Sequence, residues 1–167
     1  LDAGDIVTHI YNGKANGILR EDRIADFAFE AKRRGIYFDM GHGTDSFNFE
    51  VGEKAMEAKL YLDTVSTDIY ERNRVNGPVY DLATTMNKAL YLGYDLDEVI
   101  EMVTQKPAEI LGLEKRGLLK EGYKADLSFF KVEEQAMDLI DSNGNRRKQS
   151  QNIQAVGVFK DGQYRPI

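Results

Sequence analysis

Two histidines and one aspartate are the residues of this chain best placed to do chemistry. His9 closes a short apolar run at residues 5–9, and Asp68 closes another at residues 64–68. A neutral imidazole binds divalent metals and can act as a general base near neutral pH. A carboxylate can hold a cation and move a proton from water. By spacing alone, His9 could also be a structural histidine and Asp68 a helix or turn cap.

Further polar residues follow the same kind of run. His42 stands in the sequence Gly-His-Gly, whose glycines permit close approach of the backbone to a ligand. It could donate a hydrogen bond to a substrate oxygen, or it could simply occupy a tight turn. Asn12 and Tyr70 could line a substrate pocket, although both residue types are common in exposed loops. Asp39 and Asp45 flank His42, where carboxylates are typical turn formers.

Several other site types are absent from the sequence. There is no cysteine, which excludes disulfides and thiolate metal sites. No glycine-rich loop of the P-loop or dinucleotide type occurs, and no closely spaced histidine pair of the metalloprotease type. A catalytic zinc site uses three protein ligands, whereas this chain offers His9 and Asp68 as its two good candidates.

The elements that must position these residues alternate between strand, loop and helix. We expect strands at residues 5–9, 36–38 and 61–66, and helices at residues 23–34, 49–59, 80–92 and 96–103. In the helix at 80–92, Leu82 should face inward. Such units form a parallel sheet, and functional residues gather at the carboxyl ends of its strands. The pattern predicts an α/β protein with His9, His42 and Asp68 at strand ends.

The remainder of the chain has a different pattern. Residues 126–132 read as a strand, and residues 153–160 should pair with 163–165 across the turn at Asp161-Gly162. Residues 141–145 should form a turn or a mobile loop. This part of the chain is predicted to be an antiparallel appendage.

Composition narrows the classes of partner. The 167 residues carry a net charge of −6, which argues against a broad nucleic-acid or anionic-membrane surface. No apolar run approaches the roughly 18–20 residues of a membrane span. Residues 1–5 lack the basic start and apolar region of a signal peptide. We therefore expect a cytoplasmic protein that binds neither nucleic acid nor a membrane.

Two late segments resemble a signature of the amidohydrolase superfamily. Residues 104–113 read TQKPAEILGL, and residues 117–127 read GLLKEGYKADL. In that family, a helix with the pattern T-x-x-P-A-x-x-L-G-L leaves the barrel, and a segment G-x-L-x-x-G-x-x-A-D-L enters a small β-sandwich. The pairing and order of the two patterns make the resemblance specific. The whole chain is similar to the C-terminal half of the amidohydrolase/deacetylase branch, which includes dihydroorotase-like proteins.

The resemblance implies a fold and a site. Residues 1–113 would be strands six to eight of a (βα)8 barrel, and residues 114–167 would be strands of the β-sandwich domain. One or two divalent metals, usually zinc, would lie at the carboxyl ends of the barrel strands. His9 would match a metal ligand on strand six. Asp68 would match the catalytic aspartate of strand eight, which holds metal and moves a proton, and His42 would match a strand-seven residue that contacts substrate.

The family's other metal ligands have no counterpart here: the His-x-His pair of strand one, the lysine of strand four and the histidine of strand five. The resemblance therefore implies a fragment of an enzyme with a small-molecule amide substrate, which hydrolyses C–N bonds of cyclic amides or N-acyl compounds, and we expect the fragment to be inactive alone. Two alternatives are a non-catalytic α/β binding module and a subunit that completes a barrel with another chain, such as a homo-oligomer.

Overall fold

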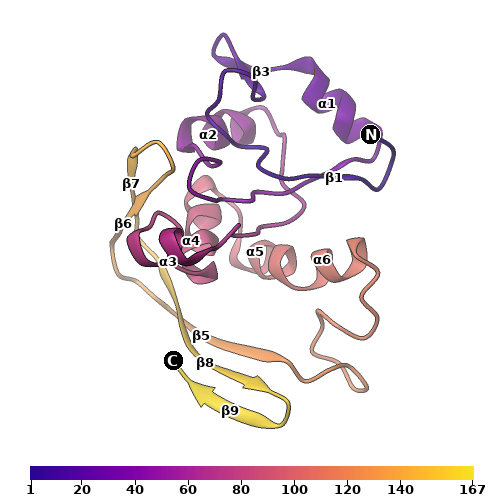
Figure 1. Cartoon of the computed structure of the whole chain (residues 1–167), viewed down its shortest axis with the longest axis vertical. Helices are drawn as coiled ribbons and strands as arrows, with labels where there is room; N and C mark the ends of the chain where they lie inside the picture. Colours follow the sequence, from indigo (N-terminus) through magenta and orange to yellow (C-terminus); the bar gives the residue numbers. More distant parts are fainter.

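The computed structural model describes residues 1–167, and it has an α/β architecture (Figure 1). Its helices are α1 (Asp26–Arg33), α2 (Phe49–Glu57), α3 (Glu71–Asn76), α4 (Leu82–Leu92), α5 (Leu96–Val103) and α6 (Gln105–Ile110). Its strands are β1 (Ile6–Val7), β2 (Leu19–Arg20), β3 (Arg23–Ile24), β4 (Tyr37–Phe38), β5 (Leu127–Glu133), β6 (Met137–Ile140), β7 (Arg146–Gln149), β8 (Asn152–Lys160) and β9 (Gln163–Pro166).

Three short parallel segments form the part of the fold that leads to the polar residues. Strand β1 pairs in parallel with β4, and Asp39 forms a parallel bridge to Thr64. The expected strand at 61–66 is reduced to this single bridge. Backbone hydrogen bonds nevertheless continue beyond it, from Met40 N to Thr64 O at 3.1 Å and from His42 N to Ser66 O at 3.1 Å. The three segments therefore run side by side and end on the same side.

The helices begin and end where capping residues allow. Asp81 caps α4 by accepting a hydrogen bond from Thr84 N at 2.6 Å, and Gly93 ends it in the left-handed region at φ 104°. Asp95 forms a capping box with Glu98 at the start of α5. The predictions for 80–92 and 96–103 are therefore confirmed to within two residues.

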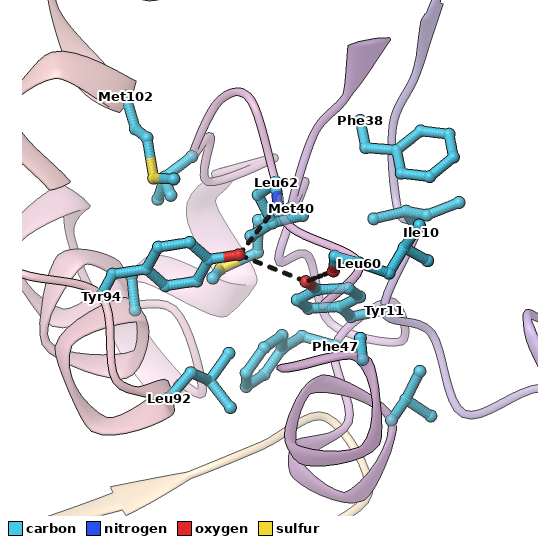
Figure 2. Close-up of a cluster of buried hydrophobic side chains, with 14 of the residues drawn as sticks. Ile10, Tyr11, Phe38, Met40, Phe47, Leu60, Leu62, Leu92, Tyr94 and Met102 are labelled. Atoms are coloured by element: carbon cyan, nitrogen blue, oxygen red, sulfur yellow. Dashed lines mark hydrogen bonds between the residues drawn. The ribbon is translucent and has the colours of Figure 1, made fainter. Parts of the chain in front are cut away.

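A single apolar core lies between the parallel segments and the helices. Figure 2 shows Tyr11 and Tyr94 meeting within it, with their hydroxyl oxygens 3.3 Å apart. Tyr11 donates to Leu60 O at 2.8 Å, and Tyr94 accepts from Leu62 N at 2.8 Å. The buried hydroxyls thus satisfy the backbone of residues 60–62, where the third parallel segment begins.

The C-terminal strands form an antiparallel sheet in the order β5-β8-β9 and a separate β6-β7 hairpin. The expected pairing of 153–160 with 163–165 is confirmed, with Phe159 opposite Tyr164. In Figure 1 this sheet projects from the end of the molecule opposite α1. The hairpin instead lies against the helices, and its buried residue Leu139 belongs to the same core as Tyr11.

Residues 141–145 form a turn, as expected, and hydrogen bonds hold it in place. The buried carboxylate of Asp141 accepts hydrogen bonds from Asn143 N, Asn145 N, Asn145 Nδ2 and Phe49 N, all at 2.8–2.9 Å. Ser142 N also donates to Phe47 O at 3.0 Å. The turn is thereby fixed to the residues just before α2.

None of the helices combines the length and the apolar character that a membrane span requires.

Candidate functional site

The structure brings His9 and Asp68 together at the ends of the first and third parallel segments, with the second segment between them. His9 Nε2 lies 3.9 Å from Asp68 Oδ2, and the side chains are 37% and 55% exposed. Both residues adopt a left-handed backbone, with φ of 61° and 45°. This conformation strains the backbone of a non-glycine residue, and strained residues of this kind are often found at functional sites. Two ionisable side chains predicted from strand ends 59 positions apart therefore share one open rim.

The orientation of His9 is fixed by one hydrogen bond. Its Nδ1 bonds to the carbonyl oxygen of Gly41. A carbonyl can only accept, so the ring proton is on Nδ1 and the lone pair is on Nε2. That lone pair faces Asp68, and this arrangement is typical of histidines that bind metals.

A buried carboxylate ties the three parallel segments together beneath these side chains. Asp39 Oδ2 accepts hydrogen bonds from Thr8 Oγ1 at 2.7 Å and Ser66 Oγ at 2.6 Å, and Oδ1 accepts from Thr64 Oγ1 at 2.7 Å. Thr8 directly precedes His9, and Ser66 is two residues before Asp68. Asp39 therefore holds both strand ends at a fixed separation, which is more than the turn-forming role expected of it.

The segment of residues 41–43 lies between the two rim side chains. A Cβ on Gly41 would come 2.6 Å from His9 Nδ1, and a Cβ on Gly43 would come 2.6 Å from Asp68 Oδ2. Gly43 N also donates to Thr67 O at 3.0 Å. Glycine is required at both positions because any side chain would displace the groups that form the rim.

His42 does not contribute an exposed group to this rim. Its side chain is fully buried, with Nδ1 donating to Gly43 O at 2.8 Å and Nε2 accepting from Lys88 Nζ at 2.6 Å. Burial is the largest cause and the charge of nearby Lys88 the second; together they lower the pKa of His42 to about 3. Burial lowers the pKa of Lys88 to about 7, against the opposing influence of Asp141 and Asp81. The expected substrate contact by His42 conflicts with this position, because both ring nitrogens are occupied inside the protein.

Asn12 and Tyr70 lie in different settings. Asn12 Nδ2 donates to His9 O at 2.7 Å, so it supports the turn after His9. Tyr70 is 48% exposed, and its hydroxyl lies 2.8 Å from Thr44 Oγ1. Three residues after Tyr70, the side chain of Asn73 donates a hydrogen bond to Asp68 O at 3.0 Å. Sequence analysis did not identify Asn73 as a support of Asp68, because Asn73 lies between the expected strand at 61–66 and the expected helix at 80–92, where we expected no helix or strand.

The donor set partly fits a divalent cation. Two ligands of one tetrahedral zinc ion lie about 3.4 Å apart, given Zn–N and Zn–O distances of about 2.0–2.2 Å. The observed 3.9 Å between His9 Nε2 and Asp68 Oδ2 is close to this value, and both atoms face the open rim. No group of three or more His, Cys, Asp or Glu side chains in the chain could hold a metal ion. The chain therefore supplies two ligands of a site that needs more.

The structure is that of an α/β protein with polar groups at the carboxyl ends of its parallel strands, which is where such proteins bind their ligands. Comparison with known proteins makes this specific, since residues 9–164 match the amidohydrolase family. The chain belongs to the amidohydrolase family. It is 48% identical over 165 residues to a deacetylase of Enterococcus faecalis, covering 98% of this chain and 45% of that protein.

Two solved structures are similar across the chain. The crystal structure of an adenine deaminase has a TM-score of 0.97 and 47% identity, covering 100% of this chain and 46% of that one. The crystal structure of a dihydroorotase has a TM-score of 0.88 and 33% identity, covering 99% and 44%. The chain thus spans slightly less than half the length of these relatives.

Proposed function

We propose that this chain is part of a metal-dependent amidohydrolase that cleaves C–N bonds of N-acyl compounds or cyclic amides. The observation that carries the proposal is the 3.9 Å separation of His9 Nε2 and Asp68 Oδ2 at a shared, open rim. The deacetylase, adenine deaminase and dihydroorotase named among its relatives support the reaction class. The three parallel segments would be strands six to eight of a (βα)8 barrel, and the β5-β8-β9 sheet would belong to a β-sandwich.

His9 and Asp68 would hold a divalent cation, with zinc as the first candidate for an imidazole and carboxylate pair. Such a cation lowers the pKa of a water molecule towards 7 and polarises a carbonyl group. His9 contributes its Nε2 lone pair, which the Gly41 carbonyl keeps directed at the rim. Asp68 has a half-exposed carboxylate that can take a proton from the attacking water and return it to the leaving nitrogen.

The remaining ligands would come from residues outside these 167, because a catalytic zinc site takes three protein ligands and this chain offers two. We therefore expect no metal-dependent hydrolysis from the chain alone. The complete protein should act on at least one of two substrate types that the names of its relatives suggest: N-acetyl compounds and dihydroorotate, a cyclic amide.

The test compares His9→Ala and Asp68→Asn with wild type in the complete protein, using zinc-loaded enzyme and these substrates. Second-sphere partners of metal ligands are worth about 10–100-fold, so loss of either residue should reduce kcat by more than 100-fold. Asp45→Asn is the matched control, because Asp45 is an exposed carboxylate near the same rim. Full activity in both variants would contradict the proposal, as would hydrolysis by the 167-residue chain alone.

A further inference from the structure

The buried pair of Lys88 and His42 lies inside the protein, and the proposed chemistry does not use it. Lys88 Nζ donates to His42 Nε2 at 2.6 Å and to Pro78 O at 2.7 Å. Both side chains are fully buried, and no buried polar side-chain atom in the structure lacks a partner. Lysine is among the residues least often buried, so its presence on the inner face of α4 calls for a reason.

Stability alone does not supply that reason. An amine loses hydration when it is buried, and two hydrogen bonds to neutral acceptors recover only part of this loss. The low pKa of Lys88 reports the same cost. An apolar side chain of similar length could fill the space on α4 without it.

The position of His42 offers a better reason. Its backbone belongs to the 41–43 segment, which touches both rim residues: Gly41 O accepts from His9 Nδ1, and Gly43 N donates to Thr67 O next to Asp68. The ring of His42 packs on Phe47, with ring centroids 4.9 Å apart, and Lys88 occupies its inner nitrogen. Lys88 is thus the polar group from another element that fixes this ring.

We propose that Lys88 is a positioning residue: by holding the His42 ring from within, it fixes the 41–43 segment and so sets the placement of His9 against Asp68. This inference rests on the proposed function, because the placement matters only if the two side chains share a cation. Lys88 and His42 do not themselves touch the substrate or the metal.

The test introduces Lys88→Met into the complete protein, with Lys106→Met on the exposed surface of α6 as the matched control. We expect three results for Lys88→Met. The urea midpoint of unfolding changes little, because the cost of burying an amine disappears while His42 Nε2 and Pro78 O lose their donor. The Nδ1–H tautomer signature of His9 in nitrogen NMR weakens or broadens without any metal present. The zinc affinity, measured by calorimetry with zinc sulfate, falls about 10-fold or more. Lys106→Met should change none of these.

A second pair of variants tests the same inference if Lys88→Met does not fold. His42→Gln keeps an acceptor near the Nε2 position for Lys88, whereas His42→Leu removes it. The first should preserve the His9 signature and the second should not. Equal behaviour of the two variants, or an unchanged His9 signature in folded Lys88→Met, would overturn the inference. If wild type binds no zinc while its His9 signature depends on Lys88, the positioning role stands and the proposed function fails.

Discussion

The His42 imidazole should remain neutral far into the acid range. Burial, and then the neighbouring Lys88, lower its pKa to about 3 from the usual 6.5. Each pH unit between these values is worth about 1.4 kcal/mol, so the whole difference corresponds to at most about 5 kcal/mol of unfolding free energy. Lys88→Met removes the second cause and leaves the first, so it should raise the His42 pKa without restoring the ordinary value.

The unfolding free energy should change with pH, because the folded and unfolded chains bind a different number of protons at residue 42. Between pH 6.5 and about 3, residue 42 is protonated in the unfolded chain and neutral in the folded chain. The unfolded state binds more protons, so stability rises with pH across this window and is lost as the pH falls through it. His42→Gln cannot titrate, and its unfolding free energy should fall less steeply than that of wild type over the same window.

The assay is a pH titration in which nitrogen NMR monitors the imidazole rings. The chain has two histidines, and His9→Asn identifies the signals of His42. We expect the His42 nitrogens to keep the chemical shifts of a neutral imidazole down to about pH 4.5, where an exposed histidine has completed its titration. Conversion of these nitrogens to imidazolium shifts, with a midpoint between about pH 6 and 7, would refute the buried, lysine-bonded arrangement.

Three further substitutions test the supports of the rim and of the 141–145 turn, each by urea unfolding. Asp39→Ala removes three hydroxyl hydrogen bonds and should cost about 2–4 kcal/mol, whereas exposed Asp45→Ala should cost less than about 0.5 kcal/mol. Gly43→Ala places a Cβ 2.6 Å from Asp68 Oδ2 and should lower both stability, by about 1–2 kcal/mol, and zinc affinity. Gly112→Ala, also at positive φ but in open space, should leave zinc affinity intact. Asp141→Ala leaves four donors without their acceptor and should cost about 2–4 kcal/mol.

The position of the candidate site could be predicted from the sequence because strand ends are local features. Short apolar runs followed by polar residues place His9 and Asp68 at carboxyl ends, and parallel strands carry their ends to the same side. The strand lengths were less predictable. The 61–66 strand contracts to one bridge at Thr64, since ladder formation depends on neighbours that are distant in sequence.

Residues whose role depends on distant partners were missed or misplaced. Helix α3 carries no apolar period, so periodicity could not find it. In α4, Leu82 was expected to face inward but is 41% exposed. Polar Asn87 and Lys88 are buried there instead, because Asn87 bonds to Ile153 N at 2.8 Å and Lys88 bonds to His42. Periodicity recognises apolar faces, and it cannot show that a polar side chain has a partner in a distant part of the chain.

The proposed function requires that His9 and Asp68 bind the same divalent cation. Crystals of the complete protein grown with zinc, with X-ray data collected at the zinc absorption edge, would locate that cation. We expect an anomalous peak within about 2.0–2.2 Å of both His9 Nε2 and an Asp68 carboxylate oxygen. Bound zinc that contacts neither side chain would contradict it.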